Sequence, residues 1–283
     1  MKFRSHAVAL AASVACASAP AFASDTVQAT QVGTNNLVTM QQIANSGNNG
    51  ATIVQGLSGL ADGNSASISQ RTVGGSLAVV GQDGIGNLGT VDQRSTNASQ
   101  VTISQQSFGS GSTATVEQAG TSLSITNLQQ VGDGNSAASS QQQTLGSQTK
   151  LLQQGDANTA QLMVARADGS LVNLNQLGTG NYALVNQHQG TSLVLNASSM
   201  GQDNMLLVDQ SGADSLAQTD QLGAGNSLSV TQKGNAGSGG INTAVIQQAG
   251  SGNVADVTQR GAAFTANLSQ WGVGNTATIQ QRF

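Results

Sequence analysis

Proline, charge and aromatic side chains are scarce in this sequence, and each scarcity argues against a class of protein. Of the 283 residues, 8% are charged and 2% aromatic, whereas ordinary globular domains carry about 25% charged residues. A conventional closed core is hard to build from so few large apolar groups. Disordered chains are usually rich in charge and proline, yet the single proline here is Pro20. The composition therefore fits neither an ordinary globular domain nor a disordered chain.

Cysteine is also nearly absent, and the one present, Cys16, lies in a stretch typical of a secretory signal. Residues 1–23 combine a positive start, a small apolar stretch and a small-x-small site that ends at Ala23. We expect cleavage there, a repeat region over 24–283, and a secreted protein. A membrane anchor and a lipid-modified Cys16 are the alternatives. The apolar stretch is shorter than the ~20 residues that span a bilayer, and the residues before Cys16 match a lipobox poorly. Without a disulfide, an exported chain must gain its stability elsewhere.

Positively charged residues are also few. Nine lysines and arginines face 13 acidic residues, the formal net charge is −4, and no basic run occurs. We therefore do not expect nucleic acid as the main partner. Charges fall in turns, between repeats or at outward strand positions. There we interpret them as gatekeepers that slow lateral aggregation: Asp133, Asp156, Asp203, Arg166, Lys233, Arg260, Lys150, Asp209 and Asp256.

What the chain does contain is a short alternation of polar and apolar residues, clearest in Ser170–Gln187. Two segments of seven residues, 170–176 and 181–187, flank four residues that include Gly178 and Gly180. Side chains two residues apart share one face of a strand, so each segment is predicted to be a strand. The glycines between them predict a turn. The unit is therefore strand–turn–strand.

This unit recurs about every 23 residues, which is typical of a solenoid or an array. From Asn64 onward the spacing of equivalent residues ranges from 22 to 27. We predict an all-β fold: a β-solenoid of about eleven strand–turn–strand repeats, stacked as parallel in-register layers in the cross-β manner. The repeats begin near Asp25, Asn49, Ser76, Ser99, Ser124, Ser147, Ser170, Leu193, Ser215, Asn242 and Phe264.

The recurring pattern is Ser-x5-Gln-x-Gly-x-x-Asn-x-Ala-x3-Gln, and its amide and glycine positions are the candidate functional residues. Repeat two has a longer turn before Asn64, repeat four has Ser112 in place of Asn, and repeat six has Val164 in place of the final Gln. The amide positions predicted to self-assemble are Gln31, Asn36, Gln42, Gln70, Gln82, Asn87, Gln93, Gln130, Asn135, Gln141, Gln153, Asn158, Gln176, Asn181, Gln187, Asn204, Gln210, Gln221, Asn226, Gln232, Gln248, Asn253, Gln259, Gln270, Asn275 and Gln281. The turn glycines are Gly33, Gly84, Gly132, Gly155, Gly178, Gly201, Gly223, Gly250 and Gly272.

The amides fall on the same strand face as the apolar residues, which argues against the alternative of solvated amides in a linker. Gln176, for example, shares its face with Val172 and Leu174. A column of stacked amides can hydrogen-bond to itself, and each such bond stabilises by ~0.5–1.5 kcal/mol net. Any slip in register would break the whole column. The apolar core is expected from Ala51/Ile53, Val101/Ile103, Leu193/Leu195 and Ala244/Ile246 in first strands and from Ala66/Ile68, Ala114/Val116, Leu206/Val208 and Ala255/Val257 in second strands.

On these residues the chain resembles the curlin repeat family, the subunits of bacterial curli fibres. The resemblance covers Asp25 to Gln281 and rests on five polar positions that recur at fixed spacing. It implies export through a dedicated outer-membrane curli secretion pore with accessory factors, a nucleator subunit as partner, and polymerisation on the cell surface into an amyloid that forms biofilm matrix.

No catalytic, cofactor or metal site is expected. Ser147 and Lys150 match the Ser-x-x-Lys motif of penicillin-recognising enzymes, but the alternation points them in opposite directions and no Lys-Thr-Gly follows. His188 is the only histidine after the predicted signal, so no triad or zinc site can form around it. The turn aspartates lack the Gly-Gly-x-Gly-x-Asp pattern of calcium-binding β-rolls.

We therefore predict a structural, non-enzymatic subunit of a curli-like extracellular amyloid fibre, used in biofilm matrix, adhesion and aggregation. The first and last repeats leave no residues for a polar cap, and uncapped layers that stack without closing produce a fibre. The partner is then another copy of the chain. The alternatives are a nucleating minor curli subunit or a monomeric β-solenoid adhesin or ice-binding protein. Irregular outward positions, such as Asn173 against Gln218, disfavour ice binding.

Overall fold

The computed structural model describes residues 11–17, 25–56, 61–234 and 240–282, and these residues form strands and turns without a helix. The 21 strands pair only in parallel and build two facing walls. The first wall contains β2 (Thr26–Gln31), β4 (Gly50–Gln55), β6 (Leu77–Gly84), β8 (Gln100–Ser107), β10 (Ile125–Val131), β12 (Gln148–Gln154), β14 (Leu171–Thr179), β18 (Asn242–Ser251) and β20 (Thr265–Val273). The second contains β1 (Ala11–Ala17), β3 (Leu37–Ile43), β5 (Ser65–Arg71), β7 (Leu88–Arg94), β9 (Thr113–Ala119), β11 (Ser136–Gln142), β13 (Thr159–Asp168), β17 (Ser227–Lys233), β19 (Val254–Arg260) and β21 (Thr276–Arg282).

Two long strands belong to both walls. β15 (Tyr182–Gln202) pairs with β13 through its first half and with β14 through its second half. β16 (Met205–Ala224) turns the same corner one layer later. The chain turns at the corner within β15, where Gln189 and Ser192 adopt positive φ angles of 52° and 54°, and the register of the pairing with β16 shifts between His188 and Gly190.

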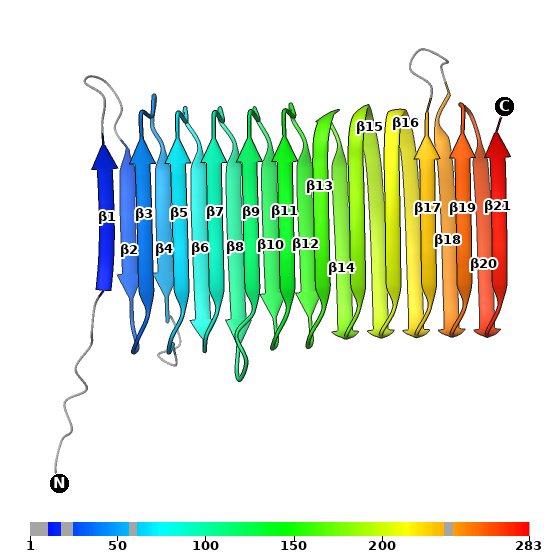
Figure 1. The fold of residues 1–283 in the computed structure, drawn as a ribbon, viewed down its shortest axis with the longest axis horizontal. Helices are drawn as coiled ribbons and strands as arrows, with labels where there is room; N and C mark the ends of the chain where they lie inside the picture. The colour runs from blue at the N-terminus through cyan, green and yellow to red at the C-terminus, as the bar shows by residue number, and fades with distance from the viewer. Residues whose placement is uncertain (1–10, 18–24, 57–60, 235–239, 283) are drawn as a thin grey trace, which may run out of the picture.

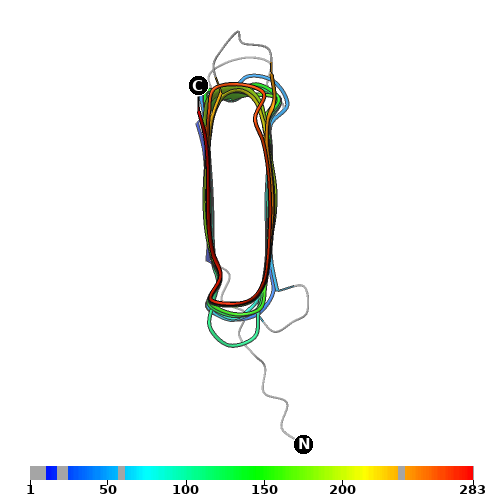
Figure 2. The ribbon, with the colours of Figure 1, turned by 90° about the vertical axis from the view of Figure 1, so that its right-hand side faces the viewer.

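When each half of β15 and β16 is counted as one strand, every strand pairs with the strand two places further along the chain, so the chain coils as a solenoid of about eleven turns. We call each turn a layer and number the layers 1 to 11 from β2–β3 to β20–β21. Figure 1 shows the strands side by side in chain order, and Figure 2, along the solenoid axis, shows the layers superimposed in one flattened outline. The prediction of an all-β solenoid with parallel in-register layers is confirmed.

The core lies between the walls, on the strand face that the alternation predicts. Inward positions such as Ala51, Ile53, Leu174 and Val185 are fully buried. One detail of the expected core differs. In layer 8, Leu195 pairs with Val172, and Ala197 with Leu174. Leu193 therefore occupies the corner position of Ser170 rather than the first core position.

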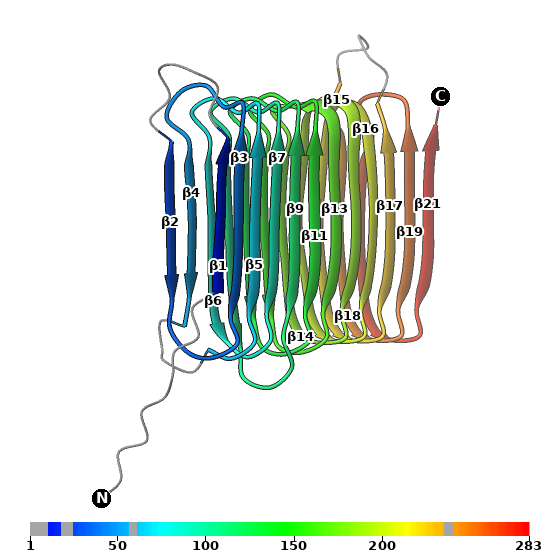
Figure 3. The same ribbon diagram turned by 60° about the vertical axis from the view of Figure 1, so that its left-hand side comes forward.

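The predicted signal lies mostly outside the described residues, including the expected cleavage site at Ala21–Ala23. Its described part, β1, pairs along its whole length with β3, so that it flanks the second wall. Figure 3 shows β1 in this place, whereas β2 and β4 begin the first wall. Among the described residues, no strand pairs with β2 on the side away from β4. The part of the chain that the structure describes holds no helix long and apolar enough to cross a membrane.

Candidate functional site: the amide columns and the end layers

The glutamines of both walls stand in columns that run along the solenoid axis. In each column the Nε2 of one layer donates to the Oε1 of the next layer, at 2.7–3.1 Å. The donor always lies in the earlier layer, so every column has the same direction. The first wall carries Gln31, Gln55, Gln82, Gln105, Gln130, Gln153 and Gln176, then Gln221, Gln248 and Gln270. The second carries Gln42, Gln70, Gln93, Gln118 and Gln141, then Gln187, Gln210, Gln232, Gln259 and Gln281.

The same amides also tie one wall to the other. The Nε2 of Gln153 donates to the backbone carbonyl of Ser136 at 3.1 Å, and that of Gln210 to the carbonyl of Val194 at 3.1 Å. A buried glutamine thus uses one N–H along the column and one across the corner. Removing such a side chain would leave both acceptors short of a donor, which costs ~1–3 kcal/mol for each buried polar group left unpaired.

Each column is interrupted once. In the second wall Val164 takes the glutamine position between Gln141 and Gln187. In the first wall Ser199 takes it between Gln176 and Gln221. Beyond each interruption, a glutamine Oε1 is buried without a hydrogen-bond partner. Within the described residues, the buried glutamine oxygens without a partner are those of Gln31, Gln42, Gln187 and Gln221. All four stand at the start of a column segment.

The asparagines form a second kind of column, at the corner where the first wall turns into the second. The Oδ1 of Asn158 accepts the backbone N–H of Asn181 in the next layer at 3.1 Å, and its Nδ2 donates to the carbonyl of Gly178 at 2.8 Å. Ser112 stands in this column in layer 4. Its backbone N–H donates to the Oδ1 of Asn87 at 3.1 Å, and its Oγ accepts the N–H of Asn135 at 3.2 Å. The hydroxyl of Ser112 therefore accepts the same backbone hydrogen bond that an asparagine Oδ1 accepts in the other layers.

The opposite corner carries a column that the sequence analysis marked only as the start of each repeat. Backbone N–H groups there donate to the preceding side chain, as Ser99 does to the Oγ of Ser76 at 3.1 Å and Phe264 to the Oδ1 of Asn242 at 3.2 Å. Turn hydroxyls join it, because the Oγ of Ser99 lies 3.1 Å from the Oγ1 of Thr121. Three equivalent pairs follow one another: Ser76–Thr96, Ser99–Thr121 and Ser124–Thr144.

The predicted turn glycines adopt positive φ angles, from 88° at Gly84 to 118° at Gly250. L residues rarely adopt this region. Space is a second requirement, since a Cβ at Gly178 would overlap the carbonyl oxygen of Gly201 in the next layer. These glycines therefore allow successive corners to stack at strand spacing.

The end layers carry column residues of the same types as the interior, but in the described chain no strand lies beyond layer 11 or beyond β2 of layer 1. At layer 11, Nε2 of Gln281 donates to the carbonyl of Thr265 at 3.0 Å, and Nε2 of Gln270 to that of Val254 at 3.1 Å. In both amides the N–H that would continue the column has no further glutamine to reach in the described chain. Inward apolar groups are also incompletely covered at the ends, as shown by the partly buried Val27, Leu268 and Ile279.

Backbone donors alternate in direction along each strand. Outward residues donate to the next layer, as Val254 does to the carbonyl of Asn275 at 2.7 Å. Inward residues donate to the preceding layer, as Gly261 does to Lys233 at 2.9 Å. By this alternation, the N–H groups of Thr276, Thr278 and Gln280 point away from β19. No described strand lies on that side of β21.

Two of the turn aspartates bind the backbone of neighbouring layers. The Oδ1 of Asp133 accepts the N–H groups of Phe108 at 2.8 Å and Gly109 at 2.9 Å, and Asp156 accepts the N–H of Asp133 at 2.9 Å. These two hydrogen bonds lower the pKa of Asp133 below its usual range, and the bond from Gly109 has the larger effect. The gatekeeper interpretation therefore does not describe the whole contribution of these two charges, which also bind the turn of the preceding layer.

The other sequence-level candidates stay isolated from any catalytic arrangement. His188 Nε2 lies 3.0 Å from the Oδ1 of Asp209, and both side chains are about one-third exposed. Among the described residues, no group of three or more His, Cys, Asp or Glu side chains could hold a metal ion. Trp271 and Phe108 are exposed at 72% and 67%.

Several residues that complete these columns are not among the predicted amide positions. Gln105 and Gln118 follow Ser99 and Ser112 by the spacing of the repeat, so the pattern itself could have found them. The turn threonines had no such signal, because threonine is also frequent at outward positions. The residues added by the structure are Gln55, Asn64, Gln105, Gln118, Asn49, Asn242, Thr96, Thr121 and Thr144.

No protein-family model matches the chain, and no curated protein matches it either. The resemblance to curlin repeats therefore rests on the repeat pattern alone.

Proposed function

We propose that this protein is a structural, non-enzymatic subunit of an extracellular curli-like amyloid fibre, in which copies stack head to tail. The last layer of one copy would meet the first layer of the next, so that the solenoid continues across the junction. Such a fibre would serve as biofilm matrix and in adhesion, as the curlin resemblance implies.

The observation that carries the proposal is that layer 1 has hydrogen-bond acceptors without donors, whereas layer 11 has donors without acceptors. Layer 1 holds the buried acceptors Gln31 Oε1 and Gln42 Oε1, which lack a donor. Layer 11 holds Gln270 and Gln281, whose column N–H groups have no acceptor beyond them in the described chain. A head-to-tail contact satisfies both sets. A head-to-head contact would set oxygen against oxygen, and a tail-to-tail contact would set N–H against N–H.

The first layer adds one condition. β1 lies against β3, in the place that an incoming second-wall strand would take. Our proposal therefore applies to the chain after cleavage at Ala23, which stays a prediction. The amide of Gln42 supports this reading, because its register partner in β1 is Cys16, which has no amide to donate.

The test is polymerisation of a purified chain that begins at Ser24. We expect a lag phase followed by dye-binding fibres, with a meridional reflection at ~4.8 Å in fibre diffraction. A chain that stays monomeric for days at high concentration would contradict the proposal and favour the monomeric-solenoid alternative. Seeding by a second purified subunit, with no spontaneous growth, would instead identify a fibre subunit that depends on a separate nucleator.

A further inference from the structure

Most of the lysines and arginines stand at the same position within their layers, although the sequence shows no basic run. The position directly after the glutamine column of the second wall is occupied by Arg71, Arg94, Lys233, Arg260 and Arg282 in layers 2, 3, 9, 10 and 11. Of the nine lysines and arginines, Lys2 and Arg4 lie in the predicted signal, and only Lys150 and Arg166 lie elsewhere. The members are at least 22 residues apart in sequence, so only the register brings them together.

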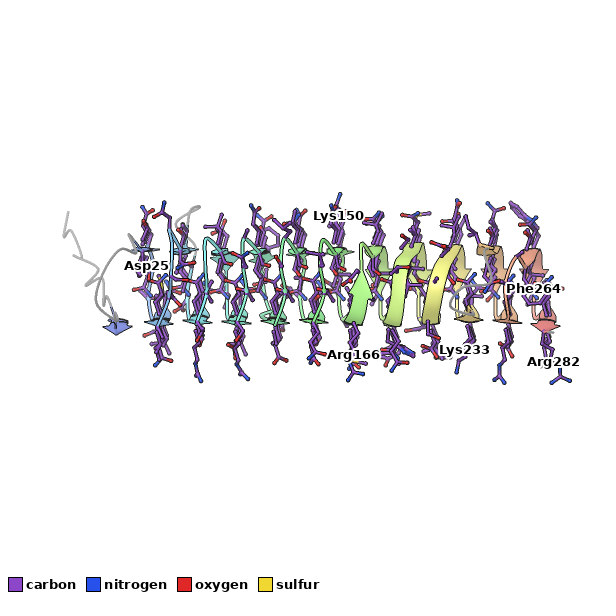
Figure 4. All side chains as sticks on the ribbon, turned by 90° about the horizontal axis from the view of Figure 1, so that it is seen from above. Asp25, Lys150, Arg166, Lys233, Phe264 and Arg282 are labelled. Carbon is purple, nitrogen blue, oxygen red and sulfur yellow. The ribbon has the colours of Figure 1, made fainter. Side chains whose placement is uncertain are left out.

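Three members of this set are consecutive: Lys233, Arg260 and Arg282. We call these three residues the basic row. They occupy three consecutive layers at the end of β17, β19 and β21, and all three are exposed. Successive strands lie about 4.8 Å apart, so the three cations form a straight file. In Figure 4, Lys233 and Arg282 point to the same side of the solenoid, whereas Lys150 points to the opposite side.

The charges of the basic row are not neutralised by neighbouring carboxylates. Among the described residues, no acidic side chain lies within ion-pair distance of these three cations. The outward residues two places before them are the neutral Thr231, Thr258 and Gln280. Of the nearest acids, Asp209 already contacts His188, and Asp256 lies four residues before Arg260. Arg94 differs, because it is paired with Asp92.

Head-to-tail stacking would extend the row. Layer 11 of one copy would be followed by layers 1, 2 and 3 of the next, which carry Ile43, Arg71 and Arg94 at this position. Five cations would then occupy six successive layers at every junction. After cleavage at Ala23 removes Lys2 and Arg4, seven of the nine cations remain against 13 acidic residues, a net charge of −6. This charge does not cancel such a row, because exposed charges beyond about 8 Å are screened at physiological ionic strength.

We propose that the basic row binds a linear acidic polysaccharide, with one carboxylate per sugar lying along the solenoid axis. A sugar in an extended chain has a length similar to the strand spacing. In an extended two-fold chain every second sugar turns its carboxylate to the same side, so carboxylates can reach alternate cations of the row, such as Lys233 and Arg282. The hydroxyl groups of Thr231 and Thr258 beside the row can hydrogen-bond to sugar hydroxyls.

Nucleic acid fits this surface less well. The phosphates of a duplex strand, one per 3.4 Å of helix axis, wind around the helix, so a straight file meets few of them. Proteins that bind single strands add aromatic side chains on which bases stack. Among the described residues, the basic row and the outward positions two places before it, Thr231, Thr258 and Gln280, carry none.

The site in a single copy does not depend on fibre formation, but its extension across junctions rests on the proposed function. The experiment therefore measures binding of sodium polygalacturonate to monomer and to fibre separately. The variant is K233Q/R260Q/R282Q. The control is K150E/Q218E, which changes the net charge by the same three units on outward positions of the first wall.

We expect the variant to lose at least tenfold in affinity in both forms, with a weaker dependence of affinity on salt for each cation removed. We expect the control to bind as the unaltered chain does. Fibres should bind at least tenfold more tightly than monomer, because linked sites act together. Equal losses in variant and control would overturn the proposal, as would row-dependent binding of duplex DNA that is tighter than that of polygalacturonate at the same salt. If no fibres form, the monomer measurement still decides the basic row, while the fibre proposal fails alone.

Discussion

The amides of the first layer need donors, whereas those of the last layer have donors to give. Gln31 and Gln42 each bury an Oε1 without a partner, while Gln270 and Gln281 hold N–H groups beyond which the described column stops. The backbone edges carry donors and acceptors at both ends: outward N–H groups of β21 point away from β19, and by the same alternation inward N–H groups of β2 point away from β4. The two ends are therefore complementary to each other and not to themselves. That asymmetry is what a polar, unclosed assembly requires.

The interior reproduces the first-layer situation in two places. Gln187 follows Val164, Gln221 follows Ser199, and both bury an unpartnered Oε1. The chain tolerates these defects because the backbone ladder continues through them. An unpartnered amide oxygen thus does not by itself define an end. The end also needs a free backbone ladder and uncovered apolar side chains.

The largest effect should come from deleting interior amides: Gln130 and Gln153 each bond to a glutamine in both neighbouring layers, and Gln176, the last of its column segment, bonds to Gln153. In Q130A/Q153A/Q176A three column bonds and the bonds to Thr113, Ser136 and Thr159 are lost. At ~1–3 kcal/mol for each buried group left unpaired, we expect a loss of several kcal/mol in the free energy of unfolding, together with much slower fibre formation. Denaturant unfolding and seeded growth measure the two effects.

The matched variant N173A/N175A/N186A changes three outward amides. Only Asn173 of the three makes a side-chain bond to another layer, to Asn196 at 2.9 Å. We expect a change of less than about 1 kcal/mol, as is usual for surface substitutions. Equal effects of the two triple variants would show that the inward columns do not hold the layers together.

The next effect should be the loss of growth at one end only. N267P/T278P places proline in β20 and β21, at outward positions whose N–H groups face the missing next layer. Proline is tolerated on an edge strand when its nitrogen faces outward. Because every junction joins a layer 11 to a layer 1, the folded variant should add once to the layer 11 end of unaltered labelled seeds and cap it. Unaltered monomer supplied afterwards should then extend these seeds from the layer 1 end alone, as measured by imaging of single fibres. Growth at both ends at the unaltered rate would exclude stacking through layer 11.

The inward neighbours provide the contrast for that experiment. Ala277 and Ile279 donate back to β19 by the same alternation, so proline there should unfold layer 11 itself. The variant A277P/I279P should accordingly lose β-structure in circular dichroism, which N267P/T278P should keep.

A smaller effect is expected from reversing one donor at the last layer. Q281E replaces the free N–H of Gln281 with a carboxylate, which would face the Oε1 of Gln42 in the next copy. Losing one such contact at ~1–3 kcal/mol predicts a fall in elongation rate of roughly ten- to a hundredfold. Q280E adds the same charge at the neighbouring outward position, and we expect little change. Seeded elongation rates compare the two variants, and identical rates would argue against an amide contact at the junction.

Much of this arrangement follows from the sequence because stacking is strictly periodic. A period near 23 residues predicts the layers, and the parity of Gln176 or Ala183 predicts which side chains meet inside. The direction of the columns does not follow, since an amide can present either its oxygen or its nitrogen to the next layer. The basic row was missed for another reason. A search for charge runs cannot see Lys233, Arg260 and Arg282 as neighbours until the register is known.

The smallest predicted effect separates interior defects from true ends. V164Q would supply the missing amide of layer 6, accepting from Gln141 and donating to the unpartnered Oε1 of Gln187. Space for it exists in principle, because the neighbouring column members are fully buried glutamines. Two new bonds at ~0.5–1.5 kcal/mol each should raise the free energy of unfolding by about 1–3 kcal/mol, whereas M163Q at the adjacent outward position should not. The elongation rate should stay unchanged in both, since neither variant touches layer 1 or layer 11. Faster elongation in V164Q would mean that growth responds to column continuity throughout the molecule. The hypothesis that layers 1 and 11 alone control elongation would then be wrong.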